Sequence, residues 1–203
     1  MSENQLYDKQ GNRLYMTGEE RIAFLSAANT VDRKVKTLCN VLVYTGCRIS
    51  EALELTPRRL NLSEESLVLR SLKKRKDKDG NPRIVFRSVP VPSMLIEQLD
   101  LVYGIREIQQ RGDTTALDAL IWPWSRVWGW KKIKEVMDAA AIAEGPHKTA
   151  KGLRHGYGVA AMQAGIQLNM LQKWMGHADM KTTAIYANAL GEEERAIAAR
   201  MWQ

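Results

Sequence analysis

The sequence predicts an α+β fold that is mostly α-helical, in which a helical bundle carries one small antiparallel β-hairpin or sheet. Most of the 203 residues lie in segments with apolar residues at helical spacing, bounded by capping residues and glycines. One pair of short strand-like segments, joined by a polar turn, interrupts them. Because no repeat, low-complexity tract or linker divides the chain, we expect a polar tail over residues 1–16 and one domain over residues 17–203.

The first three helices are predicted from the residues at their ends. Thr17 and Glu20 have the spacing of a capping box, so a helix should follow them. A second helix over residues 32–44 carries apolar residues at helical spacing and stops at Gly46, where glycine tolerates a positive φ. A third helix should begin at Arg48, where the chain changes direction and opens a helix N-terminus suited to anions.

A β-hairpin with a basic tip should follow the third helix. Residues 66–72 and 83–91 have strand composition, and the turn residues between them favour a loop over residues 73–83. That loop holds six lysine or arginine residues and only two aspartates. An ordinary solvated loop is one interpretation, but charge of one sign favours a surface that binds an anionic partner.

The second half of the chain is predicted to be almost entirely helical. Ser125 should cap one helix, a Gly145-Pro146 break should precede a glycine- and alanine-rich helix, and a turn at Gly176 and His177 should separate two short ones. The helices are expected over residues 93–110, 125–141, 148–165, 169–175, 181–187 and 192–202.

Composition narrows the class of protein. The net charge of +7 and the pI of about 9.5 favour a polyanionic partner, most simply nucleic acid. No apolar run approaches the roughly 20 residues that cross a bilayer, and the polar N-terminus is not a signal peptide. Cys39 and Cys47 suggest neither a disulfide framework nor a metal site, so we expect free thiols and a cytoplasmic location.

Four segments carry groups that handle phosphate chemistry. They are TGCRISEAL around Arg48, the basic hairpin, KGLRH around Arg154, and GHADMKTTAIY, which ends at Tyr186. In this order and spacing the chain resembles the catalytic domain of tyrosine recombinases, the phage-integrase family of enzymes that break and rejoin DNA. The resemblance covers about residues 17–190. Each motif alone is weak, and their order together with the spacing from His177 to Tyr186 makes the resemblance specific.

The resemblance implies a role for each catalytic position. Tyr186 matches the nucleophile that forms a 3′-phosphotyrosyl link and leaves a free 5′-hydroxyl. Arg48 and Arg154 match the two arginines that stabilise the phosphorane, and such fixed cations can replace a metal. Lys73 matches best the hairpin lysine that protonates the leaving oxygen, and His177 matches a position that donates to a phosphate oxygen.

Supporting positions also match the family. Glu51 and His155 correspond to residues that orient the catalytic groups, and Lys74 is an adjacent alternative to Lys73. A slip of one residue along a strand would direct the lysine to the other face. The hairpin residues expected to contact DNA are Lys74, Arg75, Lys76, Lys78 and Arg83.

Two features depart from the family. The usual histidine three positions before Arg154 is Lys151, which shares a helix face with that arginine and could reach the same phosphate. A lysine buried among cations could also act as a base. His147 could supply the imidazole instead, or the enzyme could be impaired; we favour Lys151.

The second departure is the short N-terminus. Only about 16 residues precede Thr17, so we expect that the N-terminal DNA-clamping domain is missing, either naturally or by truncation.

Three functions are compatible with this resemblance. The intact Tyr186 and arginine pair favour a site-specific recombinase or integrase of a bacterial or phage-like mobile element, acting on double-stranded DNA without a cofactor or metal. The alternatives are a catalytically impaired DNA-binding regulator and a relaxing enzyme like a type IB topoisomerase.

In the family, a C-terminal helix such as that expected over residues 192–202 docks on a neighbouring protomer. We therefore expect a homotetramer on synapsed DNA and a monomer when free.

Overall fold

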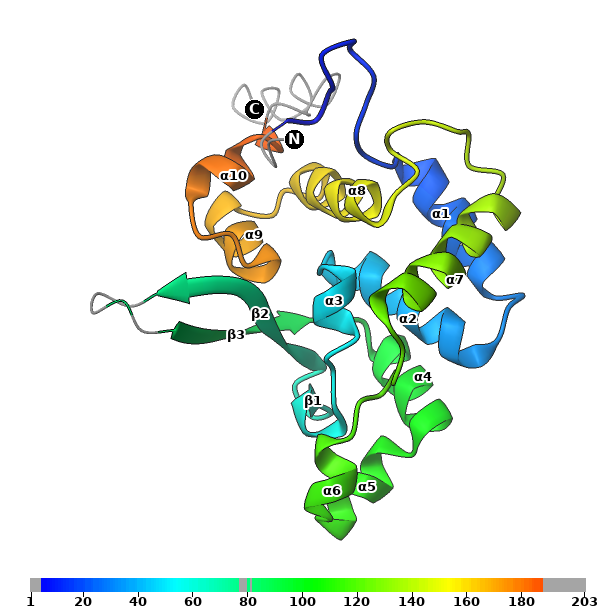
Figure 1. Ribbon diagram of the computed structural model, residues 1–203, viewed down its shortest axis with the longest axis vertical. Helices are drawn as coiled ribbons and strands as arrows, with labels where there is room; N and C mark the ends of the chain where they lie inside the picture. Colours follow the sequence, from blue (N-terminus) through cyan, green and yellow to red (C-terminus); the bar gives the residue numbers. More distant parts are fainter. Residues whose placement is uncertain (1–4, 77–79, 81, 188–203) are drawn as a thin grey trace, which may run out of the picture.

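Helix α2 (Arg33–Thr45) lies at the centre of the fold in the computed structural model, which describes residues 5–76, 80 and 82–187 (Figure 1). Nine of its 13 residues are buried, because four other helices pack against it: α1 (Gly18–Ala28), α4 (Ser93–Tyr103), α7 (Arg126–Ala139) and α8 (Ala150–Gln163). Asp32 caps the helix by accepting from two backbone N–H groups, and Gly46 ends it with a φ of 58°. The prediction for this helix is confirmed, and the short helix α3 (Ile49–Ala52) follows directly.

The N-terminal region joins the same core. Thr17 and Glu20 form the predicted capping box at the start of α1 (Gly18–Ala28), with backbone-to-side-chain distances of 2.9 and 3.2 Å. In the segment expected to be a polar tail, Leu6 and Met16 are buried. Residues 5–16 therefore pack against the domain.

The sheet is antiparallel and has the strand order β1-β2-β3. The ladder pairs Lys76 with Pro82, so the prediction that residues 73–83 form one loop is wrong. Ladder hydrogen bonds come from the backbone, so a run of charged residues does not by itself end a strand. The short first strand was not predicted at all. The strands are β1 (Leu60–Asn61), β2 (Ser66–Lys76) and β3 (Pro82–Pro90).

The predicted helix over residues 93–110 is two helices. Gly104 adopts a φ of 63°, which ends α4 (Ser93–Tyr103) and allows α5 (Ile105–Arg111) to begin in a new direction. A further short helix that was not predicted, α6 (Thr114–Asp118), follows and is capped by Asp113. The break between α4 and α5 was not predicted, because apolar residues keep their helical spacing on both sides of Gly104. The turn η1 (Pro57–Arg59) packs against α5 and α6.

The remaining helices agree with the predictions to within a few residues. In Figure 1, α8 runs across the upper part of the molecule. Helices α9 and α10 lie to its left, and α7 lies to its right. Helix α9 packs against β3, and α7 packs against α3. The helix expected over residues 192–202 lies outside the described residues. The described helices are too short or too polar to cross a membrane. The four remaining helices are α7 (Arg126–Ala139), α8 (Ala150–Gln163), α9 (Leu168–Met175) and α10 (Met180–Ala184).

Candidate active site

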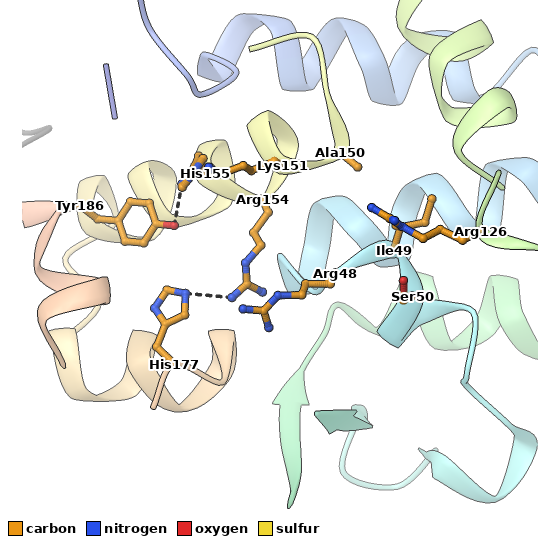
Figure 2. A pocket seen from close by; sticks show the side chains of 10 residues that line it. All are labelled: Arg48, Ile49, Ser50, Arg126, Ala150, Lys151, Arg154, His155, His177 and Tyr186. Atoms are coloured by element: carbon orange, nitrogen blue, oxygen red, sulfur yellow. Dashed lines mark hydrogen bonds between the residues drawn. The ribbon is translucent and has the colours of Figure 1, made fainter. Parts of the chain in front are cut away.

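A cavity of about 370 Å³ lies where α3, α7, α8 and the segment around α10 meet (Figure 2). Five of the six residues predicted to be catalytic line it, and they come from three of the four motif segments. Four residues that were not predicted as site residues line it as well. The lining residues are Arg48, Ile49, Ser50, Arg126, Ala150, Lys151, Arg154, His155, His177 and Tyr186.

Arg48 is positioned by a buried carboxylate. It stands immediately before α3, where its backbone N–H and its Nη1 both donate to Glu51 at 3.1 Å. Glu51 also accepts from Arg87 Nη2 at 2.6 Å. Burial alone would raise the pKa of Glu51, but the charge and hydrogen bond of Arg87 outweigh it and hold that pKa below its usual value. The ionised Glu51 can therefore orient Arg48, as the resemblance implied for a supporting residue.

Arg154 is buried and held by three protein groups. Its guanidinium donates to the Gly46 carbonyl at 2.7 Å, to the Met175 carbonyl at 2.8 Å and to His177 Nε2 at 2.9 Å. Burial, followed by the nearby charge of Arg48, lowers its pKa to about 10, so it remains charged at neutral pH. A guanidinium has five N–H donors, so these three bonds do not use all of them.

His177 is neutral and lies in the turn after Gly176, whose φ of 69° ends α9. Burial, followed by the charges of Arg154 and Arg48, lowers its pKa to about 3. Because a guanidinium can only donate, Nε2 accepts from Arg154, and Nδ1–H donates to Thr183 Oγ1 at 2.9 Å. In this arrangement His177 can donate to a phosphate oxygen only after Arg154 turns away and Nε2 gains a proton.

Tyr186 follows α10 and is only 1% exposed. Its hydroxyl lies 2.9 Å from His155 Nδ1, and its ring stacks on His177 at 6.3 Å between centroids with an 11° interplanar angle. Gly158 makes room for that ring, because a Cβ there would lie 2.5 Å from Tyr186 Cε1. Figure 2 shows the hydroxyl end directed towards the two arginines.

The two replacements considered for the missing histidine occupy different places. Lys151 lines the cavity on the same helix as Arg154, but it is exposed, so the burial assumed for a lysine base is absent. His147 is buried beside Glu20, with 3.4 Å between Nε2 and Oε1. It is not among the described residues that line the cavity, which argues against the alternative in which it supplies the imidazole.

In the part of the hairpin that was expected to contact DNA, the structure describes the backbone of residues 73–76, 82 and 83. The β2–β3 register is irregular between Ser71 and Arg75, which brackets Lys73 and Lys74, so simple strand alternation cannot assign their directions. Arg75 pairs with Arg83 in the ladder. The side chains of residues 73–76 and 83, and all of Lys78, lie outside the described part of the chain.

Sequence reasoning missed two arginines. Arg126 lines the cavity from the first turn of α7, a turn with no acidic residue. A cation there opposes the helix dipole, which is a signal that an anion could bind nearby.

Arg87 lies on the buried face of β3 and donates to Glu51 and, at 2.7 Å, to the Trp174 carbonyl. A charge at an inward strand position requires a partner, and alternation along β3 could have indicated it.

Comparison with known proteins identifies the family. The sequence model described as "Phage integrase family" matches residues 12–193. The chain belongs to this family. The tyrosine recombinase XerD of Mycobacterium tuberculosis (strain H37Rv) is 31% identical over 158 residues, which cover 74% of this chain and 46% of that protein. This phage integrase family member spans about half the length of the curated relatives it matches.

Solved structures show the same fold. The XerA recombinase has a TM-score of 0.67 at 24% identity, covering 90% of this chain and 64% of that one. The XerH site-specific recombinase bound to difH substrate in a pre-cleavage complex has a TM-score of 0.65 at 19% identity, covering 97% and 60%. The fold predicted from the sequence is therefore confirmed as that of tyrosine recombinase catalytic domains.

Proposed function

We propose that this chain is a site-specific tyrosine recombinase that cleaves and rejoins double-stranded DNA through a 3′-phosphotyrosyl intermediate. One observation carries the proposal: the Tyr186 side chain lines the same cavity as the guanidinium groups of Arg48 and Arg154. A nucleophile beside two fixed cations suits attack on a phosphodiester. The named recombinases among its relatives support the same activity.

The arginines would hold the scissile phosphate before the reaction begins. Arg154 is already fixed by two backbone carbonyls and Arg48 by Glu51, so little reorganisation is needed when charge develops on the phosphorane. Arg126 and the exposed Lys151 line the same cavity and would add positive charge along the neighbouring DNA backbone. The cavity therefore provides charge stabilisation without requiring a metal ion.

The proposed reaction exchanges one phosphodiester bond for another. The Tyr186 oxygen forms a bond to phosphorus, the bond from phosphorus to the 5′-oxygen breaks, and the 5′-oxygen takes a proton from a general acid. By the family resemblance we assign that acid to Lys73, with Lys74 as the alternative. Rejoining runs the same steps in reverse, so no ATP is consumed. A homotetramer on synapsed DNA, monomeric when free, remains part of this proposal.

Covalent trapping tests the proposal and identifies the target sequence in the same experiment. The protein is incubated in excess EDTA with nicked duplexes whose arms are randomised, and DNA that stays bound on a denaturing gel is recovered and sequenced. Wild-type protein should enrich one sequence, and Tyr186→Phe should give no adduct although it folds. An adduct in Tyr186→Phe, or one that forms only with added magnesium, would overturn the proposal. Strand exchange between two labelled copies of the enriched site then separates recombination from DNA relaxation.

A further inference from the structure

The proton on the Tyr186 hydroxyl needs an acceptor when that oxygen attacks phosphorus. A phenol at neutral pH is a weak nucleophile, and a positioned base within hydrogen-bond distance is the usual activator. His155 Nδ1 lies 2.9 Å from this hydroxyl, and the two residues are 4% and 1% exposed. The bond is therefore shielded from water and already has the length that proton transfer requires.

The other candidate bases are less well placed. Both ring nitrogens of His177 are already bonded, Nε2 to Arg154 and Nδ1 to Thr183. Lys151 is exposed, and as an ammonium it can only donate. His147 is buried beside Glu20, away from the cavity lining.

We infer that His155 is the proton acceptor for Tyr186, an inference that rests on the proposed function. In cleavage, the hydroxyl proton passes to Nδ1 while the tyrosine oxygen bonds to phosphorus and the 5′-oxygen leaves. In rejoining, the imidazolium returns that proton to the departing tyrosine oxygen. His155, the residue after Arg154, thus accepts the proton in place of the usual family histidine, which is Lys151 in this chain. Lys151 then contacts phosphate.

The surroundings favour this transfer once DNA is bound. Among the described residues, the charged and titratable groups that line the cavity with this pair are Arg48, Arg126, Lys151, Arg154 and His177. A phosphate bound between the arginines brings negative charge close to the imidazolium that the transfer creates. The His155 ring is tilted by 52° to the tyrosine ring, which leaves Nδ1 directed at the hydroxyl.

The test separates a base from a residue that only positions the tyrosine. In His155→Asn, the amide stands near the place of Nδ1 and can still hydrogen-bond the phenol, but it cannot accept a proton. His155→Ala removes both functions. Adduct formation on the enriched nicked duplex should slow by about 10²–10⁴-fold in both variants. A wild-type rate in His155→Asn would show that the bond only positions Tyr186, and would overturn the inference.

Two further measurements keep the result interpretable. A duplex with sulfur at the 5′-bridging position needs no leaving-group proton, so it should rescue Lys73→Ala and fail to rescue His155→Asn. Replacing Tyr186 alone by 3,5-difluorotyrosine makes the phenol more acidic, and should shrink the loss caused by His155→Asn. Rescue by sulfur, or an unchanged loss with the fluorinated tyrosine, would overturn the inference even if His155→Ala does not fold. A wild-type protein without any adduct would overturn the proposed function first.

Discussion

The two walls of the cavity differ in how firmly the protein holds their side chains. On what we call the inner wall, Arg154, His155, His177 and Tyr186 bond to one another or to backbone carbonyls. On the outer wall, formed by Arg48, Ser50, Arg126 and Lys151, the side chains are partly or fully exposed. Arg126 and Lys151 are the most open of these four.

This difference separates two tasks. The inner wall is arranged during folding, so Arg154 and the nucleophile need little reordering when DNA arrives, whereas His177 would first have to exchange its bond to Arg154. On the outer wall Arg48 is held by Glu51, whereas Arg126 and Lys151 are exposed cations, which suits attraction of a polyanion more than geometric control. Substitutions on the inner wall should therefore affect stability and chemistry together, whereas those of Arg126 and Lys151 should affect DNA affinity alone.

The largest effect is expected from Arg154. Arg154→Ala should lower the cleavage rate by about 10²–10³-fold or more, because a fixed donor to the phosphorane is lost. It should also destabilise the fold, since the buried carbonyls of Gly46 and Met175 lose donors worth about 1–3 kcal/mol each. Arg154→Lys keeps a charge without the planar fork, and should recover little of either loss. Urea unfolding and adduct rates measure the two effects.

The matched control for this prediction is Arg126→Ala on the outer wall. Its free energy of unfolding should stay within about 0.5 kcal/mol of the wild-type value, because Arg126 is exposed. If Arg154→Ala unfolded at the same urea concentration as this control, the proposed distinction between the two walls would fail.

The next effect concerns the space around the nucleophile. Gly158→Ala would place a Cβ 2.5 Å from the Tyr186 ring, so the ring must shift or the helix must move. We expect a loss of about 1–3 kcal/mol in the free energy of unfolding, as for overpacked cores, together with slower adduct formation. Gly18→Ala, with no atom within 4 Å of the added Cβ, is the control and should be neutral. Equal thermal midpoints for the two variants would contradict the tight packing of Tyr186.

The sequence predicted what local signals specify. The capping box at Thr17 and the glycines at 46 and 176 marked helix ends correctly, because those conformations depend on neighbouring residues. The break at Gly104 was missed, because apolar spacing continues on both sides of it. Whether a glycine inside a periodic segment adopts a positive φ depends on what packs around it.

The candidate site was predictable to the extent that motifs carry it. Arg48, Arg154 and Tyr186 were found from motif spacing, and the structure brings them to one cavity. Arg126 belongs to no motif and reaches the cavity only because α7 folds beside α3. The bond between His155 and Tyr186 joins residues 31 positions apart, and such a long-range contact follows from tertiary packing alone.

A smaller effect is expected from the outer wall. Replacing Arg126 and Lys151 together by alanine should make the log–log salt dependence of DNA affinity shallower by roughly 1.8, at about 0.9 for each lost phosphate contact. Stability should not change, since both side chains are exposed. The control is Arg58→Ala, which removes an exposed arginine that pairs with Asp118 at 2.7 Å and does not line the cavity. An identical slope in the double variant would show that these cations do not contact phosphates.

The last expected effect is a dependence of stability on pH that originates in the inner wall. Burial and the neighbouring arginines lower the pKa of His177 from 6.5 to about 3, whereas the unfolded chain titrates near the ordinary value. Between those values the unfolded state binds the extra proton, so the free energy of unfolding should fall as the pH falls from 6.5 towards 3. The slope for one proton cannot exceed about 1.4 kcal/mol per pH unit.

Chemical unfolding between pH 6.5 and 5 tests this origin, because that range lies above the ordinary pKa of 4.5 of carboxylates such as Glu51. His147 has a pKa lowered mainly by burial and contributes in the same direction, so His147→Asn provides the background. His177→Asn retains a donor for Thr183 but cannot titrate, and should flatten the profile more than His147→Asn does. If both variants kept the wild-type slope, acid would act elsewhere in the protein. The fold would then lose no free energy of unfolding at low pH by keeping His177 unprotonated. In that case the proposed difference between the two walls would fail.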